Sequence, residues 1–261
     1  MKTNDLLKKI AKFYPKTIAK KYHDPVGLQT GKLKEETKTI FLCLDFDEIV
    51  YDYLEKNNLF NKIDLIITHH PFIFGTKYKV FKYDENKREL CALIDEKDIP
   101  IYSYHTNFDE GKGGMNDALA RRLELIDITP LEGDPMARGG KLPFEMNIED
   151  FAKYAMNKFD VDYSLLLNYG KSTIKSVAVV GGGGWRSFSI AMKENYDIFI
   201  SGDIPHHGRR EVISNKYNYL DMPHEIEKIF MEAFKNKLHE IAPDIEVISI
   251  DHEKLPKIIL K

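Results

Sequence analysis

Cysteine is scarce in this chain, and long apolar runs are missing. Only two of the 261 residues are cysteines, Cys43 and Cys91, and each lies within an apolar stretch. This usage predicts two buried thiols and argues against a disulfide scaffold or a thiolate metal site. No apolar run approaches the ~20 residues that are needed to cross a bilayer, and the first residues lack the apolar core of a signal peptide. We therefore expect a cytoplasmic protein that does not contact a membrane.

An excess of charge of one sign is missing as well. The chain has 38 Lys and Arg residues against 41 Asp and Glu residues, which gives a formal net charge of −3. This balance provides no general attraction to nucleic acid or to an anionic membrane. We also recognise no pattern of basic and aromatic residues that is typical of proteins binding single strands. Nucleic acid is thus a possible partner that the sequence does not support.

What the sequence does contain is an alternation of apolar strands with amphipathic helices. Such an alternation predicts an α/β fold with mostly parallel sheets, in which ligands bind outside the carboxyl ends of the strands. We expect strands at 39–45, 64–68, 100–104, 176–180, 197–201 and 245–250, and helices at 4–14, 86–96, 148–159, 187–194 and 223–239.

The order of these elements predicts two related α/β domains. Residues 128–143 are rich in proline, glycine and charge, which favours a boundary there. The strand at 64–68 is followed at once by a His pair, and the strand at 197–201 is followed a few residues later by another. This similarity is consistent with two related halves. We expect a first domain at 1–127, completed by 222–261, and a second at 128–221, with their sheets facing a central metal-containing cleft.

Imidazoles and a carboxylate follow two of the expected strands of the first domain. His69 and His70 come directly after the strand at 64–68, and His105 and Asp109 follow the strand at 100–104. Parallel strands end at the same edge of a sheet, so these side chains should lie close together. Imidazoles with a carboxylate are ligands for Zn, Mn or Fe. In the alternative reading, one His ends the strand, the other is exposed, and Asp109 caps a turn.

A second candidate group is His224-x-x-Glu227. A spacing of three residues places both side chains on one face of a helix, and Pro223 suits the first turn. Glu227 could bridge two cations, whereas Glu225 is the competing carboxylate and would point about 100° away. The alternative is an ordinary helix start, at which the helix dipole favours acidic residues.

Other polar residues are candidates for contacts with a substrate. The segment Ser201-Gly-Asp203-Ile-Pro-His206-His207 follows a strand, and His207 could hold an anionic group. Lys77, Lys79 and Lys82 follow the first His pair and could do the same, or could simply form a solvated face. The glycine-rich stretches 111–114 and 181–184 are better explained as tight turns than as phosphate loops, because neither matches a phosphate-binding motif.

Together these segments resemble the NIF-three-like family, whose members are named GTP cyclohydrolase I type 2 homologues. The resemblance covers nearly the whole chain, and the Thr-His-His-Pro and His-x-x-x-Asp segments are its most specific parts. The segments occur in the family's order: Asp24-Pro-Val-Gly-Leu-Gln29, Leu44-Asp45, Thr68-His-His-Pro71, Tyr104-His-Thr-Asn-Phe-Asp109, Gly181 to Gly184, Ser201-Gly-Asp203 and Asp221-Met-Pro-His224-x-x-Glu227.

The resemblance implies two α/β domains around a dinuclear metal centre and assembly into a ring-shaped homohexamer. It implies that His105 is a neighbour of the metal rather than a ligand. The family usually has glycine where this chain has Pro223, and the spacing from the last His to the carboxylate varies. Carried over by motif, the metal ligands would be His69, His70, Asp109, His224 and Glu227.

The family name further implies a hydrolase that opens a purine ring with water activated by metal. We therefore expect two divalent ions, which could be Zn, Fe, Mn or Co, and a nucleotide-like or phosphorylated small molecule as substrate. Glu227 or Asp109 would position or deprotonate the water, and His207 and Lys77 would bind the substrate. The alternatives are a non-enzymatic metal-binding regulatory or nucleic-acid-associated ring protein, and a cofactor-binding domain that uses residues 181–187.

Overall fold

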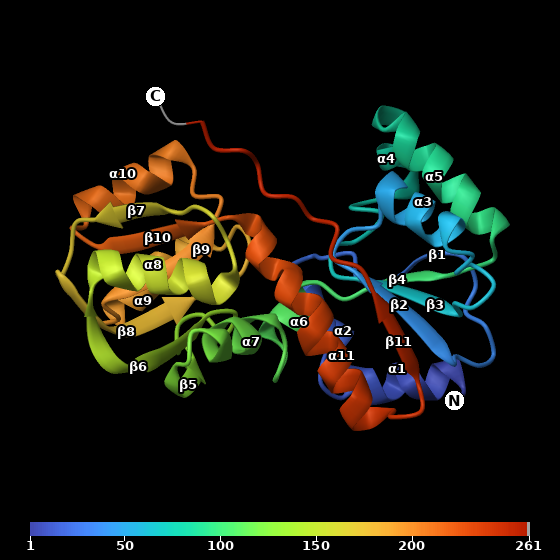
Figure 1. Ribbon diagram of the computed structural model, residues 1–261, viewed down its shortest axis with the longest axis horizontal. Helices are drawn as coiled ribbons and strands as arrows, with labels where there is room; N and C mark the ends of the chain where they lie inside the picture. The colour runs from blue at the N-terminus through green and yellow to red at the C-terminus, as the bar shows by residue number, and fades with distance from the viewer. Residues whose placement is uncertain (260–261) are drawn as a thin grey trace. The chain divides into compact units, whose positions relative to one another are not determined.

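The computed structural model describes residues 1–259, which form two compact units. Unit 1 contains Met1–Gly114 and Phe230–Glu253, and unit 2 contains Met115–Ile229 and the stretch that begins at Lys254. Each unit holds one β-sheet (Figure 1). The domain limits expected from the sequence, 127/128 and 221/222, stay a prediction.

Unit 1 is built on a five-stranded sheet with the order β1-β4-β3-β2-β11. Its four neighbouring strands β4, β3, β2 and β11 are parallel, and β1 pairs antiparallel with β4 at one edge. Every residue of β2 and β3 is buried, which explains their continuous apolar sequences. The strands are β1 (Gly27–Thr30), β2 (Thr39–Cys43), β3 (Leu65–Thr68), β4 (Ile101–Ser103) and β11 (Glu246–Ser249).

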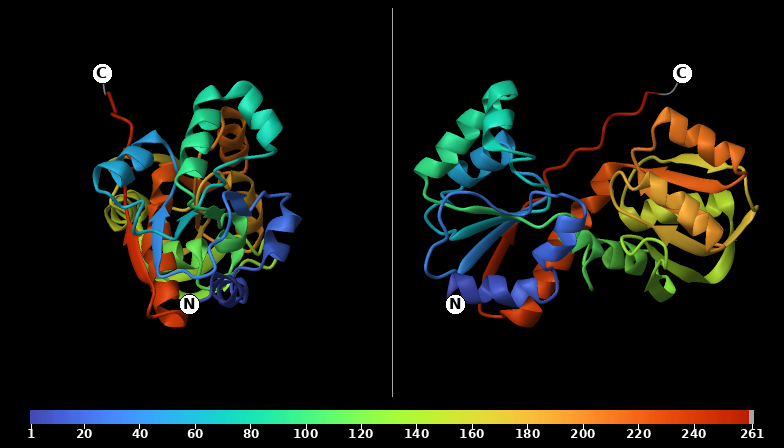
Figure 2. Two further views of the ribbon diagram at one scale, coloured as in Figure 1. Left: turned by 90° about the vertical axis from the view of Figure 1, so that its right-hand side faces the viewer. Right: turned by 180° about the vertical axis from the view of Figure 1, so that it is seen from behind.

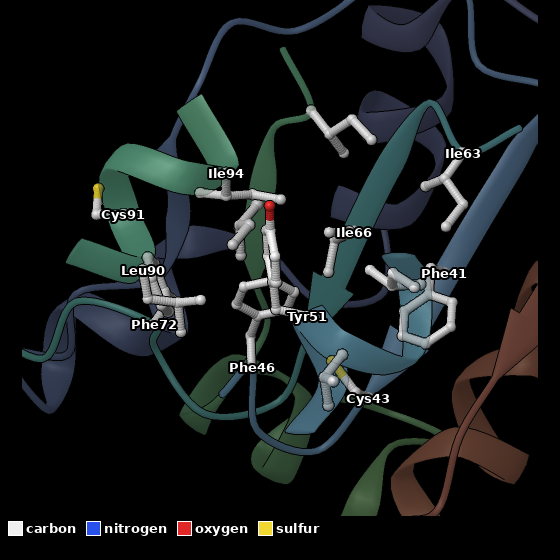
Figure 3. Packing of buried hydrophobic residues seen from close by; sticks show 14 of the residues in the cluster. Phe41, Cys43, Phe46, Tyr51, Ile63, Ile66, Phe72, Leu90, Cys91 and Ile94 are labelled. Atoms are coloured by element: carbon white, nitrogen blue, oxygen red, sulfur yellow. The ribbon is translucent and has the colours of Figure 1, made fainter. Parts of the chain in front are cut away.

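Helices cover both faces of this sheet. On one face lie α3 (Glu48–Lys56), α4 (Lys77–Tyr83) and α5 (Glu85–Glu96), and on the other lie α1 (Thr3–Ala11) and α11 (Ile229–Ile241) (Figures 1 and 2). The short helices α2 (Lys16–Lys21) and α6 (Thr106–Glu110) pack against each other. The core on the α3/α5 side includes Phe41, Phe46, Tyr51, Ile66 and Ile94 (Figure 3).

Unit 2 contains a six-stranded sheet with the order β5-β6-β8-β9-β10-β7. Its centre, β8-β9-β10, is parallel, and β5, β6 and β7 are added antiparallel. Helices α8 (Ile148–Phe159) and α9 (Phe188–Lys193) lie on opposite faces (Figures 1 and 2). The other elements are β5 (Ile126–Pro130), β6 (Arg138–Asn147), β7 (Leu165–Asn168), β8 (Thr173–Val179), β9 (Ile198–Gly202), β10 (Asn218–Met222), α7 (Met115–Arg122), the 3₁₀ helices η1 (Trp185–Ser187) and η2 (His224–Lys228), and α10 (His206–Ser214).

The fold class predicted from the sequence is confirmed: both units are α/β, with parallel strands at the centre of each sheet. The central metal-containing cleft stays a prediction. The proline- and glycine-rich segment 128–143, in which the sequence favours a boundary, contains parts of the strands β5 and β6. A Cβ at Gly139 would lie 2.0 Å from the Tyr196 hydroxyl, so glycine serves close packing inside this strand.

The C-terminal helix also differs from the prediction. A single helix was expected at 223–239, but the chain first forms the 3₁₀ helix η2 and only then α11. α11 has 13 residues, fewer than the ~20 that cross a bilayer. Within residues 1–259, no helix is long and apolar enough to span a membrane.

Candidate metal centre

The His pair of unit 1 is held by the end of the neighbouring strand. β3 ends at Thr68, and the next two backbone N–H groups donate to the residue that follows β2: His69 N to Leu44 O at 3.1 Å and His70 N to Leu44 O at 3.1 Å. The Thr68 hydroxyl donates to His70 O at 2.8 Å. The backbone of both histidines is therefore fixed at the carboxyl edge of the sheet, where the sequence predicts a ligand site.

Three imidazoles meet at this edge. His69 and His70 follow β3, and His105 follows β4 and precedes α6. One ring nitrogen from each of the three lies within 4.8 Å of the others, so together they could hold a metal ion. The resemblance implies that His105 is only a neighbour of the metal, but the structure brings it into the same group as the His pair.

Each of the three rings is oriented by a hydrogen bond at Nδ1. His69 Nδ1 lies 2.9 Å from Tyr104 O, His70 Nδ1 lies 2.7 Å from Asp45 Oδ2, and His105 Nδ1 lies 2.9 Å from Asp24 Oδ2. A carbonyl or carboxylate oxygen only accepts, so each Nδ1 carries the proton and donates it. Each Nε2 then presents a lone pair. This is the arrangement found for metal-binding histidines, and these residues therefore fit a divalent cation.

Asp109 lies beside the three imidazoles. Its Oδ1 is 3.5 Å from His69 Nε2, and its side chain is 13% exposed. α6 brings it there, because the helix starts directly after His105 and places Asp109 in its first turn. A carboxylate and imidazoles at this separation form a mixed oxygen and nitrogen donor set that suits Zn, Fe, Mn or Co.

Aromatic rings shield one side of this group from water. The His69 side chain is fully buried, and its ring centroid lies 5.2 Å from that of Phe230 and 6.3 Å from that of Phe108. Phe108 is held by α6 and Phe230 by α11. Low polarity on this side strengthens the electrostatic attraction between a cation and its ligands.

The carboxylate behind His105 is stabilised in its charged form. Burial alone would raise the pKa of Asp24, but the hydrogen bond from His105 and two more from Thr106 outweigh it and lower the pKa. Thr106 contributes its N–H at 3.1 Å and its hydroxyl at 2.6 Å. Asp24 is therefore a fixed anion that holds His105 in one orientation.

Unit 2 carries a second candidate pair, His224 and Glu227. His224 Nε2 lies 3.1 Å from Glu227 Oε2, and His224 Nδ1 lies 2.5 Å from Asp203 Oδ2. The pair meets because η2 is a 3₁₀ helix, in which side chains three residues apart lie directly above one another. Glu227 is buried, whereas Glu225, the competing carboxylate, is half-buried. Burial raises the pKa of Tyr163, and the charge of Glu225 adds to this rise.

The loop of four glycines approaches this pair closely. Gly182 has a φ of +58°, and a Cβ there would lie 2.5 Å from Glu227 Oε1 and 3.2 Å from His224 Cε1. The carbonyl of Gly182 accepts hydrogen bonds from Gly202 N and from the Ser201 hydroxyl, each at 2.7 Å. Glycine is therefore required both by the backbone conformation and by the space that Glu227 occupies.

Electrostatics at this pair favour a positive charge. The hydrogen bond to Glu227, together with the charges of Glu227 and Asp203, raises the pKa of His224 to about 9, although burial opposes the rise. A proton on His224 thus offsets part of the negative charge of the two carboxylates. The same donors suit a divalent ion.

The residues predicted to bind substrate have other neighbours. Lys77 Nζ donates to Thr30 Oγ1 at 2.9 Å. The ring of His207 lies 5.3 Å from that of Trp185, beside a surface hollow of about 290 Å³. Their contact with a substrate stays a prediction.

α4 carries a basic and aromatic pattern that was not predicted from the sequence. Its seven residues read Lys-Tyr-Lys-Val-Phe-Lys-Tyr, and none of them is buried. Tyr78 is 79% exposed and Tyr83 is 81% exposed, with Lys79 and Lys82 exposed between them. The pattern that we did not recognise in the sequence is therefore present on the surface of unit 1.

The carboxylates behind the imidazoles were also missed. Asp24, Asp45 and Asp203 each lie in a segment that carries the family resemblance, but no role was predicted for Asp24 or Asp45, and Asp203 was predicted only within a segment that could contact a substrate. Two of them follow a strand end, since Asp45 comes two residues after β2 and Asp203 directly follows β9. A carboxylate just after a strand end was the signal in the sequence that could have identified these two residues.

Comparisons with known proteins agree on the family. The family model of Duf34/NIF3 (NGG1p interacting factor 3) matches residues 1–256. A Lactococcus lactis protein named GTP cyclohydrolase 1 type 2 homolog is 28% identical over 261 residues, 98% of each chain. A Methanocaldococcus jannaschii protein of the same name is 30% identical, over 96% of this chain and 100% of its own. The crystal structure of a Bacillus cereus protein related to NIF3 shares the fold, with a TM-score of 0.87 at 20% identity over 100% of this chain and 99% of its own. On this evidence, the chain belongs to the DUF34/NIF3 family.

Proposed function

We propose that this protein binds divalent metal ions and is a metal-dependent hydrolase of a nucleotide-like or phosphorylated small molecule. The ligands would be His69, His70 and Asp109 in unit 1 and His224 and Glu227 in unit 2. Two ions per chain, from among Zn, Fe, Mn and Co, would suit these donors. The names of the relatives support a reaction of the GTP cyclohydrolase type.

The observation that carries this proposal is the common orientation of three imidazoles. His69, His70 and His105 each donate through Nδ1 to a carbonyl or carboxylate, and one nitrogen from each lies within 4.8 Å of the others. Histidines with purely structural roles have no reason to share one tautomer and one point of convergence. Binding of a cation by His69 and His70, with His105 as the neighbouring imidazole, accounts for this arrangement.

The residues of the site would have separate roles in hydrolysis. A bound divalent ion supplies a Lewis acid and lowers the pKa of water toward 7. Asp109 would accept a proton from the attacking water, because its carboxylate lies 3.5 Å from His69 Nε2 at the same edge of the sheet. Glu227, buried against His224, would do the same in unit 2. The rings of Phe108 and Phe230 beside His69 would exclude bulk water.

Metal analysis combined with a substrate screen tests the proposal. Protein purified without chelator or affinity metal should contain about two ions per chain, and His70→Ala should contain fewer. The wild type should hydrolyse a member of a panel of nucleotides and phosphate esters, with turnover that requires added metal. His239→Ala is the matched control, since His239 is an exposed histidine of α11. Wild-type turnover in His70→Ala would contradict the hydrolase assignment.

A second candidate function, binding of single-stranded nucleic acid, is favoured by α4. Tyr78 and Tyr83 offer exposed rings on which bases could stack, and the neighbouring lysines could contact phosphates. This function would show as salt-dependent retention of an oligonucleotide that survives metal removal and falls in Tyr78→Ala. Retention equal to that of a protein of similar net charge without such a helix would exclude it.

A further inference from the structure

A second polar cluster lies in unit 1, formed by Thr30, Lys77, Cys91 and Asp95. The ammonium of Lys77 lies 3.6 Å from Cys91 Sγ and 2.9 Å from Thr30 Oγ1. The Thr30 hydroxyl in turn donates to Asp95 Oδ1 at 2.6 Å and lies 3.4 Å from Cys91 Sγ. Each group contacts at least two others. An amine and a thiol are therefore held next to each other between β1, α4 and α5.

The two cysteines have different surroundings. Cys43 is completely buried in β2, and burial together with the nearby Asp45 and Asp47 raises its pKa well above the usual value. Cys91 on α5 is also buried, with 3% exposure, but it lies at the edge of the packed cluster in Figure 3 and has polar partners around its sulfur. Its thiol can donate to Asp95 Oδ2, which lies 3.8 Å away. Cys91 is thus the cysteine with a proton acceptor and a nucleophile at hand.

Thr30 connects the amine to the carboxylate. Its hydroxyl accepts a hydrogen bond from Lys77 Nζ and donates one to Asp95 Oδ1. A proton leaving the ammonium can pass along these two bonds to the carboxylate. Lys77 is exposed to solvent, so its ammonium can also lose a proton to water and become a neutral amine, which is the nucleophilic form.

We propose that Cys91, once oxidised by peroxide, forms a covalent sulfur–nitrogen link with Lys77. A sulfenic acid is known to condense with a nearby nitrogen to give a sulfenamide. Here the nitrogen is a side-chain amine that already lies 3.6 Å from the sulfur. This proposal does not rest on the proposed hydrolase function, although Lys77 is also one of the residues predicted to contact the substrate.

The reaction balances with one peroxide. Hydrogen peroxide first transfers one oxygen to the Cys91 sulfur: the O–O bond breaks, the thiol becomes a sulfenic acid, and one water leaves. The neutral amine of Lys77 then attacks the sulfur, the S–O bond breaks, and a second water leaves with a proton from the nitrogen. The sulfur is oxidised by two electrons and the peroxide is reduced by two. The extra proton of the ammonium passes through Thr30 to Asp95.

The link would fasten α4 to α5. α4 has no buried residue, and it begins at Lys77, seven residues after His70. A covalent bond from its first residue to Cys91 would fix the segment that follows the His pair. The link formed by oxidation would be reversible, since thiols reduce sulfenamides.

Mass spectrometry of the full-length protein tests the proposal. After treatment with a small excess of hydrogen peroxide, the chain should lose about 2 Da and regain them with a thiol reductant. Tryptic digestion should give a joined peptide pair containing Lys77 and Cys91. Cleavage after Lys77 should stop, while cleavage after Lys79 and Lys82 continues and serves as the internal control.

Variants separate this link from other oxidation products. Cys91→Ser and Lys77→Arg should both abolish the joined peptides, whereas Cys43→Ser should keep them. Thr30→Val should slow linking by about tenfold or more at neutral pH, and raising the pH should restore the rate because solvent then deprotonates the amine. A rate that falls equally at every pH would remove the relay role of Thr30.

Three results would overturn the proposal. The first is a loss of about 2 Da that maps to a pair of Cys43 and Cys91. The second is oxidation of Cys91 to sulfinic acid with Lys77 still cleaved by trypsin. The third is a joined pair that gains about 14 Da, because the link would then contain an oxygen between sulfur and nitrogen.

Discussion

Replacing Asp45 by alanine tests whether the carboxylates behind the imidazoles belong to a metal centre. Asp45 Oδ2 accepts the Nδ1–H of His70 at 2.7 Å. The variant keeps His70 but removes the acceptor that fixes its tautomer and its ring orientation. We expect the metal affinity to fall while the fold persists.

The size of the loss follows from the exposure of the carboxylate. Removing a partner of a metal-binding histidine usually weakens metal binding by about 10–100-fold, which corresponds to ~1.4–2.7 kcal/mol. The Asp45 side chain is 46% exposed, so water can replace it as an acceptor. We therefore expect a loss near the lower limit, about tenfold. Asp24→Ala should lower the unfolding free energy more than Asp45→Ala does, since the Asp24 side chain is only 4% exposed and also binds Thr106.

Competition between the protein and a chromophoric chelator for Zn²⁺ or Mn²⁺ gives the affinity. Denaturant unfolding of the metal-free protein gives the stability in parallel. Asp52→Ala is the matched control: Asp52 lies on α3 in the same unit, its side chain is 59% exposed, and it pairs with Lys56 on the surface. An exposed pair of this kind contributes about 0.5 kcal/mol or less, so the control should bind metal like the wild type.

Wild-type affinity in Asp45→Ala, together with reduced affinity in His70→Ala, would refute the role of this carboxylate. Loss of stability without metal, equal in size to the loss of affinity, would assign Asp45 to the fold instead. Loss of affinity alone supports the centre in unit 1.

Three further changes probe other parts of the molecule. Gly182→Ala should cost about 1–2 kcal/mol of unfolding free energy because of its positive φ, and it should weaken metal binding because its Cβ would meet Glu227; unchanged affinity would contradict the close approach. Asp197→Asn should cost about 2 kcal/mol at pH 7, because Asp197 binds Lys171 and two backbone N–H groups. Burial raises the pKa of Asp197, but these bonds lower it below 3.8 overall. Its contribution to stability is therefore present above pH 3.8 and disappears as the pH falls through the lowered value. The difference in unfolding free energy between the wild type and Asp197→Asn should therefore be smaller at about pH 3 than at pH 7. Phe108→Ala should cost about 3–5 kcal/mol in thermal or denaturant unfolding, because its ring is fully buried; a cost below 1 kcal/mol would mean that the cavity collapses.

The parts of the site that the sequence predicts are those that local pattern controls. β3 is apolar throughout and ends at a His pair, and β4 ends just before His105. The rule that parallel strands end at one edge then brings the side chains together. The pairing of His224 with Glu227 was likewise predicted from a spacing of three residues, although the helix is 3₁₀ rather than α.

The parts that could not be predicted depend on contacts between distant residues. Asp24 lies 81 residues before His105, and only the folded sheet brings them within hydrogen-bonding distance. In residues 128–143 the local sequence is misleading. Their proline and glycine content favours a loop, although parts of the segment form the strands β5 and β6. Position 139 lies within a strand and requires glycine because Tyr196 packs closely against it. This requirement cannot be seen in the local sequence.

The proton on His224 leads to the last prediction. Its hydrogen bond to Glu227 and the charges of Glu227 and Asp203 raise its pKa from 6.5 to about 9. The folded-state pKa is thus raised, so this interaction stabilises metal-free protein below pH 6.5 and is lost as the pH rises through about 9.

A metal ion must replace this proton, because imidazole binds metal only in its neutral form. Metal addition in weak buffer at pH 7 should therefore release about one proton per chain from this residue, and affinity should rise with pH until about 9. Asp203→Asn should reduce the release, since it removes one of the two carboxylates that hold the proton. If no proton is released at pH 7 and the affinity is the same at pH 7 and pH 9, then His224 does not bind the metal, and the site must be built from the donors of unit 1.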